Sequence, residues 1–545
     1  MAILSPSALS SSITYTHLAL IVACLFVASV YVKRYVSGRK IHRLGLTAPI
    51  IRTYLPWGLD MPIKACRYFL RNRAMDAWLD EWKKLGALET LNYNMELRIL
   101  TDVRVIMTAD PENIKAVLTT QFQDFGKGDE FHLEWKDFLG DSIFTTDGKQ
   151  WSDARALIRP MFQRERVADL NIIEKHVQEL FTHLGHGDGR QVDMRNLFSR
   201  FAMDVSTHFL FGHSAESLIN EQTEFATAFD EVQYKQALVG RAGPLRYFLS
   251  MMGFYNGLKT MDRFIEPWIT EALSLTPEEL EGKLKKQDTF LHALARHTSD
   301  RKVIRDQLVA LLLAGRDTTS TTLSWMILEL ARHPVVLQKL RAEIAQQVGT
   351  SRNALPTYEN IKNMKYLTWI INETLRLYPV LPFNVRTSLH DTTLPRGGGK
   401  DGSQPIGVPA NTVVGYSTLI MQRRRDLYPE ISETFPYEPD QWVPERWATW
   451  QPKAWTFIPF NGGPRICIGQ QCKLQTLPFA AKSTNVGVVA MVEMAYVMIR
   501  LFTEYDRLID YGNDNVEFGI TITLAPHPGV KVGFTQEGKG VPWTK

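Results

Sequence analysis

The sequence predicts a mainly α-helical protein with small β-sheets, an α+β fold, preceded by a single N-terminal transmembrane helix. Three observations support this. Ile13–Val32 is mostly apolar and uncharged over the ~20 residues that a membrane helix needs. Arg301–His333 carries one long helical pattern, which Pro334 stops. Strand patterns are short and occur near Glu96–Thr101, Thr412–Tyr416 and Ile520–Phe534, the last interrupted by a Pro-His-Pro-Gly turn.

Length and composition limit the class of protein. The chain has 545 residues, of which 45% are hydrophobic, and a net charge of +4. This suffices for one large domain or two small ones, and the near balance of charge gives no indication of nucleic-acid binding. The cysteines form no disulfide framework, and a zinc or iron–sulfur site would need more Cys or His at matching spacing. They are Cys24, Cys66, Cys467 and Cys472.

Basic residues follow the apolar N-terminal stretch at once: Lys33, Arg34, Arg39, Lys40 and Arg43. By the positive-inside rule, that end of the helix faces the cytosol. A cleaved signal peptide, the alternative, would have its charges before the apolar run and a small-residue cleavage site after it. The predicted organisation is therefore an anchor with its basic flank (1–43), a Pro-containing linker (44–60) and a globular domain (61–545) with an unusual insertion at 472–489.

Two short helices are expected before the long one. Asp110 followed by Pro111 is typical of a helix start, with a capping carboxylate and proline in the first turn. A second helix, Trp151–Phe162, places Trp151 and Arg155 on one face, where an indole N–H and a guanidinium can both donate to a carboxylate. Taken alone, such a pair is more often ordinary core and surface.

The long helix changes character along its length. Leu308–Ala314 is apolar on every side, which predicts burial. Small and polar residues then share one face, namely Ala314, Gly315, Thr318 and Thr322. Small side chains leave room for a small molecule, a threonine hydroxyl can bond it, and Asp317 can relay protons. The alternative is close helix packing over small residues, with Asp317 paired to an arginine.

Glu373 and Arg376 lie one turn apart on a helix that Pro379 ends. An acid and an arginine at this spacing are usually a surface ion pair of small energetic value. Here the run Pro444-Glu-Arg446-Trp447 follows further along the chain.

The run Phe460-Asn-Gly-Gly463-Pro-Arg465-Ile-Cys467-Ile-Gly469 is the most informative stretch. Glycines let the backbone turn tightly and bring N–H groups close to the sulfur, and a helix start after the loop would stabilise a thiolate. A cysteinate bound to haem iron favours O–O cleavage. The alternative is a buried structural cysteine in a glycine-rich turn.

This spaced pattern resembles the haem-binding loop of the cytochrome P450 family, with Phe460, Gly463, Arg465, Cys467 and Gly469 at the signature positions. The resemblance covers essentially the whole chain, including the anchor. It implies the haem-thiolate monooxygenase fold, in which the long central helix lies over the haem. It also implies haem b as cofactor, with the Cys467 thiolate as the axial ligand of its iron.

The resemblance assigns further roles. Trp151, Arg155 and Arg386 would contact the haem propionates. Ala314, Gly315, Asp317 and Thr318 fall in the family's oxygen-activation motif, where Asp317 and Thr318 would deliver protons. Glu373, Arg376 and Arg446 would form a buried structural cluster that locks the cysteine loop.

The implied activity is an NADPH-dependent monooxygenase that takes electrons through a flavoprotein reductase. It would act on O2 and an apolar small molecule, anchored in the lipid of the endoplasmic reticulum membrane with its catalytic domain in the cytosol. Three runs resemble fungal microsomal alkane and fatty-acid terminal hydroxylases: Phe144–Trp151, Ala314–Thr319 and Asp391–Gly398. A substrate channel would then be lined from the Phe125–Phe138 loop, Val380–Val385 and Ile522–Leu524.

One segment departs from the family pattern. The family's helix should continue directly after Gln471, but Cys472–Val489 intervenes without a helical period before Val492–Phe502 resumes it. The segment looks like translated intron or an error in gene prediction, so a catalytically impaired haem protein is one alternative. A monooxygenase of another lipophilic substrate, such as a secondary metabolite or xenobiotic, is a second. A thiolate-haem isomerase or dehydratase is a third, against which the Asp317–Thr318 pair argues.

Overall fold

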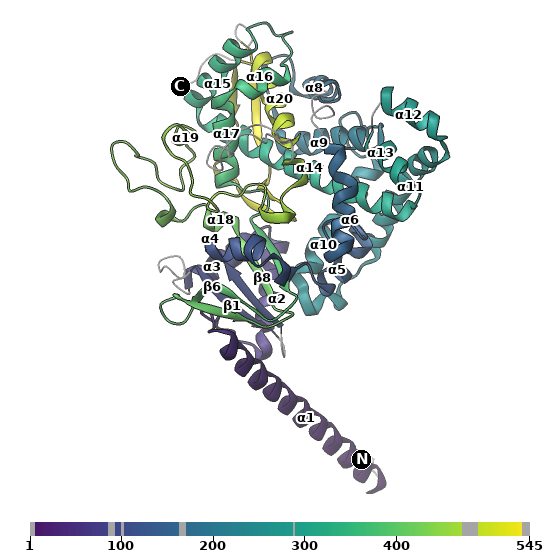
Figure 1. Ribbon diagram of the computed structural model, residues 1–545, viewed down its shortest axis with the longest axis vertical. Helices are drawn as coiled ribbons and strands as arrows, with labels where there is room; N and C mark the ends of the chain where they lie inside the picture. Colours follow the sequence, from purple (N-terminus) through teal and green to yellow (C-terminus); the bar gives the residue numbers. More distant parts are fainter. Residues whose placement is uncertain are drawn as a thin grey trace, which may run out of the picture.

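The computed structural model describes residues 6–84, 93–99, 103–162, 170–286, 289–470 and 489–536, and the structural statements below refer to these residues. Helices make up most of the molecule, with small sheets among them, as the sequence predicts (Figure 1). The helices that carry or surround the site are α2 (Asp60–Leu70), α5 (Asp129–Leu139), α6 (Gly148–Ile158), α8 (Asn171–Leu184), α9 (Met194–Phe211), α10 (Glu224–Ala242), α14 (Arg301–Arg332), α17 (Lys365–Leu377) and α20 (Val489–Glu504).

The structure describes ten further α-helices, of which α1 stands out from the domain. They are α1 (Pro6–Leu44), α3 (Ala74–Lys84), α4 (Pro111–Lys115), α11 (Met252–Ser274), α12 (Pro277–Lys286), α13 (Phe290–His297), α15 (Pro334–Gln347), α16 (Tyr358–Asn363), α18 (Thr418–Met421) and α19 (Arg446–Thr449). As expected, α4 begins at Pro111, and the Asp110 carboxylate accepts hydrogen bonds from the backbone N–H groups of Glu112 and Asn113.

The largest sheet has the strand order β1-β2-β8-β5-β3, in which β2 and β8 are parallel and the other pairs antiparallel. Its strands are β1 (Asn94–Ile99), β2 (Val103–Thr108), β3 (Phe125–Gly126), β5 (Phe383–Ser388) and β8 (Val413–Ser417). Smaller sheets join β4 (Asp188–Asp193), β12 (Lys531–Thr535) and β9 (Arg507–Asp510), and pair β6 (Thr392–Gly398) with β7 (Gln404–Val408) and β10 (Glu517–Ile520) with β11 (Leu524–His527).

Two of the predicted strands are confirmed as β1 and β8, but Ile520–Phe534 is not one interrupted strand. A second break comes at residues 521–523, where β10 turns back into β11 and Ile520 pairs with Leu524. The alternating Ile-Thr-Ile-Thr-Leu sequence hides this hairpin. Its second strand is fixed from outside, because the indole N–H of Trp325 on α14 donates to the Leu524 carbonyl oxygen at 2.7 Å.

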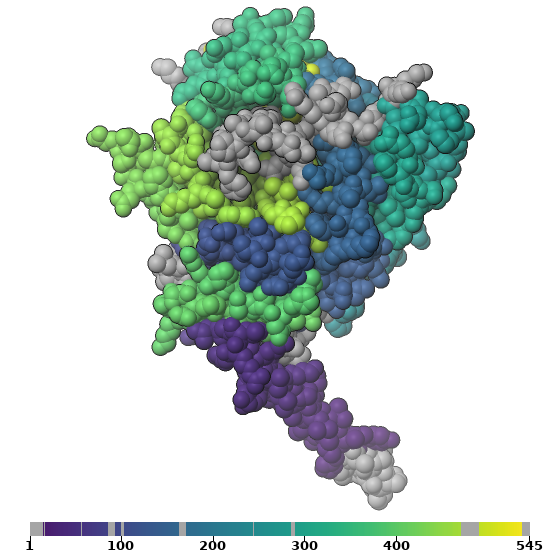
Figure 2. Space-filling view, in the orientation of Figure 1, coloured from purple at the N-terminus to yellow at the C-terminus, as the bar shows by residue number. Residues whose placement is uncertain are grey.

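The N-terminal helix α1 stands out from one end of the molecule, as Figure 2 shows in purple. Among the described residues, one helix is long and apolar enough to cross a membrane, and it spans His17–Leu44 within α1. Its inner end packs on the domain: α1 contacts β7, and Ile41 is 1% exposed.

The stretch 44–60, predicted as a linker, lies along the sheets. The Leu46 N–H donates to the Pro405 carbonyl at 2.9 Å, and the Ile51 N–H donates to the Glu96 carbonyl at 2.8 Å. Ala48 is buried between them.

The long helix α14 is confirmed and ends at Arg332, one residue earlier than predicted. The Asp300 carboxylate caps its start by accepting from the N–H groups of Lys302 and Val303. Residues 308–313 are buried, and the helix contacts α5, α9, α11, α17, α20 and β11, so it runs through the core. A side chain on α14 can therefore reach several neighbouring elements.

The helix predicted at Val492–Phe502 is confirmed as part of α20. Residues 471–488, which hold nearly all of the unusual segment and the helix expected directly after the cysteine loop, lie outside the described residues.

Candidate active site

The cysteine loop is held by its own backbone and by a neighbouring turn. The Cys467 N–H donates to the Phe460 carbonyl, and the Ile466 N–H donates to the Gly463 carbonyl, each at 3.0 Å. Gly463 has a φ of +69°, and a Cβ there would lie 1.8 Å from the Leu118 carbonyl oxygen. Position 463 therefore accepts only glycine. The Cys467 side chain is exposed, which contradicts the alternative of a buried structural cysteine.

The predicted Trp151 and Arg155 both reach this loop from α6. The Arg155 guanidinium donates from Nη2 to the Ile466 carbonyl at 3.0 Å. Burial lowers the pKa of Arg155, and the negative charge of the nearby Cys467 thiolate opposes that shift. The Arg465 guanidinium carbon lies 4.5 Å from the centre of the Trp151 ring, a cation–π contact. The structure thus brings together residues more than three hundred positions apart in the chain.

Arg386 and Arg465 face a third cation, Lys127, which the sequence analysis missed. Burial, and then the like charges of Arg386 and Arg465, hold the pKa of Lys127 well below its usual value. Burial and the charge of Arg386 lower the pKa of Arg465 to about 10. Asp147 offsets part of this charge, because its carboxylate accepts from Arg465 Nη2 at 2.5 Å and from the Lys127 N–H at 2.8 Å.

This donor set fits the two propionates of the haem that the resemblance implies. Arg386, Arg465 and Lys127 face one another, Arg155 lies near Arg465, and the Asp147 carboxylate offsets the charge of Arg465 and Lys127, so basic groups are in excess at a largely buried place. Two further carboxylates would balance this excess. The buried Nε of Arg465 also has no hydrogen-bond partner among the described residues, which leaves a donor available to an added acceptor.

On α14, the Thr318 hydroxyl donates to the Ala314 carbonyl at 2.7 Å, and the Thr322 hydroxyl donates to the Thr318 carbonyl at 2.9 Å. Both threonines therefore bond back to the preceding turn along one face of the helix. Because Thr318 uses its hydroxyl hydrogen for Ala314, the lone pairs of its oxygen can accept a hydrogen bond from a molecule bound beside it.

Gly315 lies against α9 and not beside the space that was expected for a small molecule. A Cβ at this position would lie 2.9 Å from the Ser206 hydroxyl on α9. The missing side chain therefore lets α14 and α9 approach closely, which favours the packing alternative for Gly315. Its neighbour Ala314 is half-buried and remains on the threonine face.

Asp317 is tied to α10 and to its neighbour on α14. Its carboxylate accepts a short hydrogen bond from Gln233 Nε2 and lies 3.3 Å from Arg316 Nη1. Arg316 in turn pairs with Asp230 at 2.6 Å and donates to the Ser199 hydroxyl at 2.7 Å. Burial raises the pKa of Asp317, and Arg316 opposes the shift. The arginine pairing considered as an alternative is therefore present, together with a carboxyl group that holds a proton more readily than a free aspartate.

A second buried acid lies on the other side of α14. Glu493 of α20 accepts from the Thr319 hydroxyl at 3.4 Å, and its Oε1 has no partner among the described residues. Burial raises the pKa of Glu493 to about 8. The sequence offered one signal for it, a lone acid in the apolar run Val492–Phe502.

The predicted Glu-Arg-Arg cluster is fully buried. Arg376 donates to both oxygens of Glu373 at 2.8 Å, and Arg446 Nε donates to Glu373 at 2.8 Å. Burial alone would lower the pKa of Arg376, but the charge of Glu373 outweighs it and raises the pKa; burial lowers the pKa of Arg446. Both guanidiniums stay charged, so one carboxylate serves two cations.

Gln422 connects this cluster to the segment before the cysteine loop. Its amide donates to the Arg376 carbonyl at 2.9 Å, and its oxygen accepts from the Ile458 N–H at 3.2 Å. Trp447, which donates to Glu373 at 3.0 Å, also packs on Phe457. The cluster is thus joined to the stretch that leads into Phe460.

One of the segments expected to line a substrate channel has a different secondary structure from the one predicted. Phe125–Phe138 is not a loop, because it contains β3 and most of α5, which starts after Gly128 at a φ of +78°. Ile522 is half-buried against two apolar clusters, whereas Leu524 is fully buried. Their role in binding a substrate stays a prediction.

The sequence and the fold of the chain are similar to those of known proteins. A sequence profile described as "Cytochrome P450" matches residues 95–472. The chain is 43% identical over 557 aligned residues to "Cytochrome P450 monooxygenase pvhE" of Talaromyces variabilis, covering 98% of each chain. It is 37% identical over 495 residues to "Cytochrome P450 52A1" of Candida tropicalis, covering 87% of this chain and 86% of the relative. The solved structure titled "Crystal structure of cytochrome P450DA heme domain" has a TM-score of 0.71 at 18% identity, over 91% of this chain and 99% of the other, a likeness of fold alone.

Proposed function

The chain belongs to the cytochrome P450 family and is a monooxygenase; on this premise we propose that its reaction is terminal hydroxylation of n-alkanes or fatty acids. One oxygen atom from O2 would enter an unactivated C–H bond at the chain end. The observation that carries the proposal is the presence of an exposed cysteine in a glycine-constrained loop together with a half-buried acid–threonine pair on the central helix. The substrate class rests on the three runs that resemble fungal terminal hydroxylases.

Cys467 would supply the thiolate ligand of the haem iron, and Phe460, Gly463, Arg465 and Gly469 would shape its loop. Bound haem supplies the oxidising chemistry. The propionates would be held by the cations described above and by the Trp151 indole, namely Trp151, Arg155, Lys127, Arg386 and Arg465.

Asp317 and Thr318 would handle protons. Asp317 can carry a proton on its carboxylate because burial favours the neutral form. Thr318 has its own hydrogen engaged with Ala314, so its oxygen would accept a hydrogen bond from a water molecule held beside it and so orient that proton donor. Rotation of the Asp317 carboxyl away from Gln233 would let it exchange protons with solvent.

Electrons would come from NADPH through a partner flavoprotein reductase, and the protein would be held in the endoplasmic reticulum membrane by α1 with its domain in the cytosol. An apolar surface supports membrane contact. Leu70 on α2 and Tyr247 and Phe248 after α10 are exposed, Phe248 at 86%, and α2 contacts the segment that holds the two aromatic rings. Large exposed apolar side chains gathered in this way are typical of a membrane-facing surface.

Product analysis tests the proposed substrate. The full-length protein, loaded with haem and reconstituted with reductase, NADPH and lipid, is given n-alkanes and fatty acids of graded chain length. We expect primary alcohols or ω-hydroxy acids, and no product from the haem-loaded Cys467→Ser variant. Oxidation only at internal carbons, or only of ring-containing lipophilic compounds, would overturn the substrate class while leaving the monooxygenase class intact.

A second candidate, a catalytically impaired haem protein, is favoured by one observation: the family profile match ends at residue 472, where the unusual segment begins. Deleting residues 473–489, so that the cysteine loop leads almost directly into Ala490, should then raise haem content and thermal stability. Transcripts provide an independent check, since a spliced message should lack the segment. If transcripts keep it and the full chain binds haem as tightly as the deletion variant, this candidate is wrong.

A further inference from the structure

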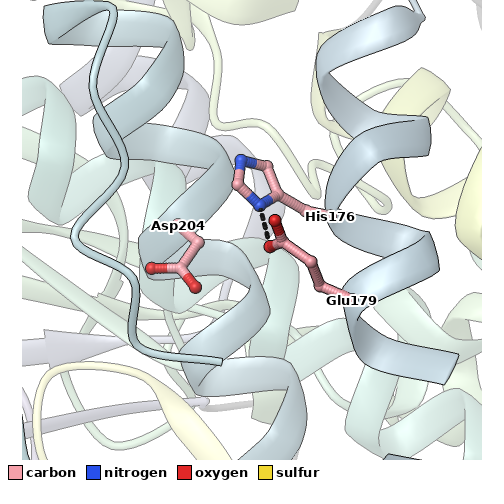
Figure 3. A group of neighbouring side chains, drawn as sticks. All are labelled: His176, Glu179 and Asp204. Atoms are coloured by element: carbon pink, nitrogen blue, oxygen red, sulfur yellow. Dashed lines mark hydrogen bonds and ion pairs between the residues drawn. The ribbon is translucent and has the colours of Figure 1, made fainter. Parts of the chain in front are cut away.

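A second group of ligand-type side chains lies between α8 and α9, and none of its members belongs to the proposed haem site (Figure 3). His176 and Glu179 stand one turn apart on α8, so they share a face of that helix. Asp204 faces them from α9. One ligand atom from each of the three side chains lies within 4.8 Å of the other two.

The negative charge of the two carboxylates in this group favours a bound cation. His176 and Asp204 are each 0% exposed, so two of the three side chains are shielded from water. Two carboxylates and a neutral imidazole carry two negative charges there, and buried charges are costly unless they are paired or bind a metal. The Nδ1 atom of His176 lies 2.6 Å from Glu179 Oε2, which places a proton where a cation would otherwise sit.

Surrounding groups orient all three side chains. His176 Nε2 lies 3.1 Å from His208 Nδ1, so the outer nitrogen of the imidazole is engaged and Nδ1 faces the carboxylates. Both oxygens of Asp204 accept backbone N–H bonds at 2.7 Å, from Ser217 and Leu218. Metal-binding histidines and carboxylates in proteins are positioned by outer partners of this kind.

The loop that supplies those N–H groups is itself fixed. Arg200 on α9 donates to the carbonyls of Ser217 at 2.7 Å and Leu218 at 2.9 Å. His183 on α8 lies 2.7 Å from the Leu218 carbonyl through its Nε2 atom. Two helices and one loop therefore form a rigid frame, and a His and an acid at i, i+3 on facing helices is a known way to build a metal site inside a helical bundle.

We propose that His176, Glu179 and Asp204 bind a divalent transition-metal ion, with Zn²⁺ the best match to one nitrogen and two carboxylate oxygens. Ligands at ~2.0–2.2 Å in a tetrahedron stand about 3.4 Å apart. Glu179 is 25% exposed and can move inward to close the remaining distance. Water would fill the fourth position. The ion joins α8 to α9 and so braces the helix that packs on α14.

The experiment uses the full-length, haem-loaded protein after dialysis against EDTA. Zn²⁺ is titrated by calorimetry, and Co²⁺ absorbance reports the geometry. We expect one tight equivalent and a higher unfolding temperature with an unchanged haem spectrum. His176→Gln and Glu179→Gln, which keep volume and polarity, should each weaken binding at least tenfold.

His186→Gln removes an exposed histidine just beyond α8 and should bind Zn²⁺ as the unmodified chain does. Three results would overturn the proposal: no stoichiometric Zn²⁺ binding, equal binding by the His176→Gln variant, or loss of binding in His186→Gln alone. In each of these cases the group is a proton-bridged structural network. The haem spectrum is recorded separately, so failure here leaves the proposed function untouched.

Discussion

Replacing Glu373 with glutamine should destabilise the domain without touching the cysteine loop directly. The carboxylate is completely buried and accepts five hydrogen bonds: two from Arg376 and one each from Arg446, the Val443 N–H and the Trp447 indole. Glutamine keeps the volume but removes the charge and presents an N–H₂ group to donors. The buried guanidiniums of Arg376 and Arg446 then lose the carboxylate that they share.

The structure sets the size of the effect. Removing one partner of a buried ion pair costs ~3–5 kcal/mol. For a domain of about 480 residues, an unfolding entropy of ~2.1 cal/mol/K per residue is roughly 1 kcal/mol/K, so this cost lowers the melting temperature by about 3–5 °C. Arg376 keeps its bonds to the Pro439 and Gln441 carbonyls at 2.6 and 2.9 Å, so the domain should still fold.

Thermal unfolding is followed by circular dichroism and by loss of the haem Soret band. Glu430→Gln, an exposed acid in the same region, is the matched control and should change neither. Combining Glu373→Gln with Arg446→Met removes one of the unpaired cations and should recover part of the loss. A melting temperature within 1 °C of the unmodified protein in Glu373→Gln would refute the reasoning, because it would mean that the carboxylate is not what balances the two arginines.

Three further outcomes test the site. Cys467→Ser should abolish the thiolate-type carbonyl spectrum of the reduced protein, and Cys24→Ser and Cys66→Ser should keep it; retention in Cys467→Ser would remove the assigned ligand. Thr318→Ala should leave haem and substrate binding intact but lower product formed per NADPH and raise released hydrogen peroxide; unchanged coupling would make Thr318 a packing residue. Burial raises the pKa of Glu493 to about 8 from 4.5, so the folded state holds this proton longer than the unfolded chain, and stability should fall as pH rises through this window. Glu493→Gln should remove that fall, by a few kcal/mol at pH 8; parallel stability–pH curves would contradict the assignment.

Residues that act through local spacing could be found in the sequence. The cysteine loop, the acid–threonine pair and Glu373 with Arg376 are each defined within a few positions, so glycine placement and helical periodicity point to them. The anchor was visible for the same reason, since hydropathy and flanking charge are local properties.

Contacts between distant segments could not be found in this way. Lys127 lies beside β3 with no motif around it. Its place in the cationic group became visible only in the structure, where Arg386 and Arg465 lie near it. Gln233 on α10 donates a hydrogen bond to Asp317 on α14, and the two residues are far apart in the sequence. Gly315 shows the converse, because the motif gave its position but not the direction of its missing Cβ, which depends on how α14 is rotated against α9. Helix rotation is set by packing of the whole core and leaves no trace in a short window.

The way the inner end of α1 is seated on the domain has a practical consequence for shortening the chain. A Cβ at Gly407 on β7 would lie 2.3 Å from the Ile41 carbonyl oxygen, so helix and strand touch backbone to backbone. Cutting at residue 44 to obtain a soluble form would uncover this glycine-lined strand and the face that Ile41 covers, and such a form should self-associate. A cut near residue 38 would keep the contact and still remove most of the apolar helix. Because the inner end of α1 is fixed on the domain, an anchor inserted in a bilayer as proposed would also set which face of the domain is turned toward the lipid.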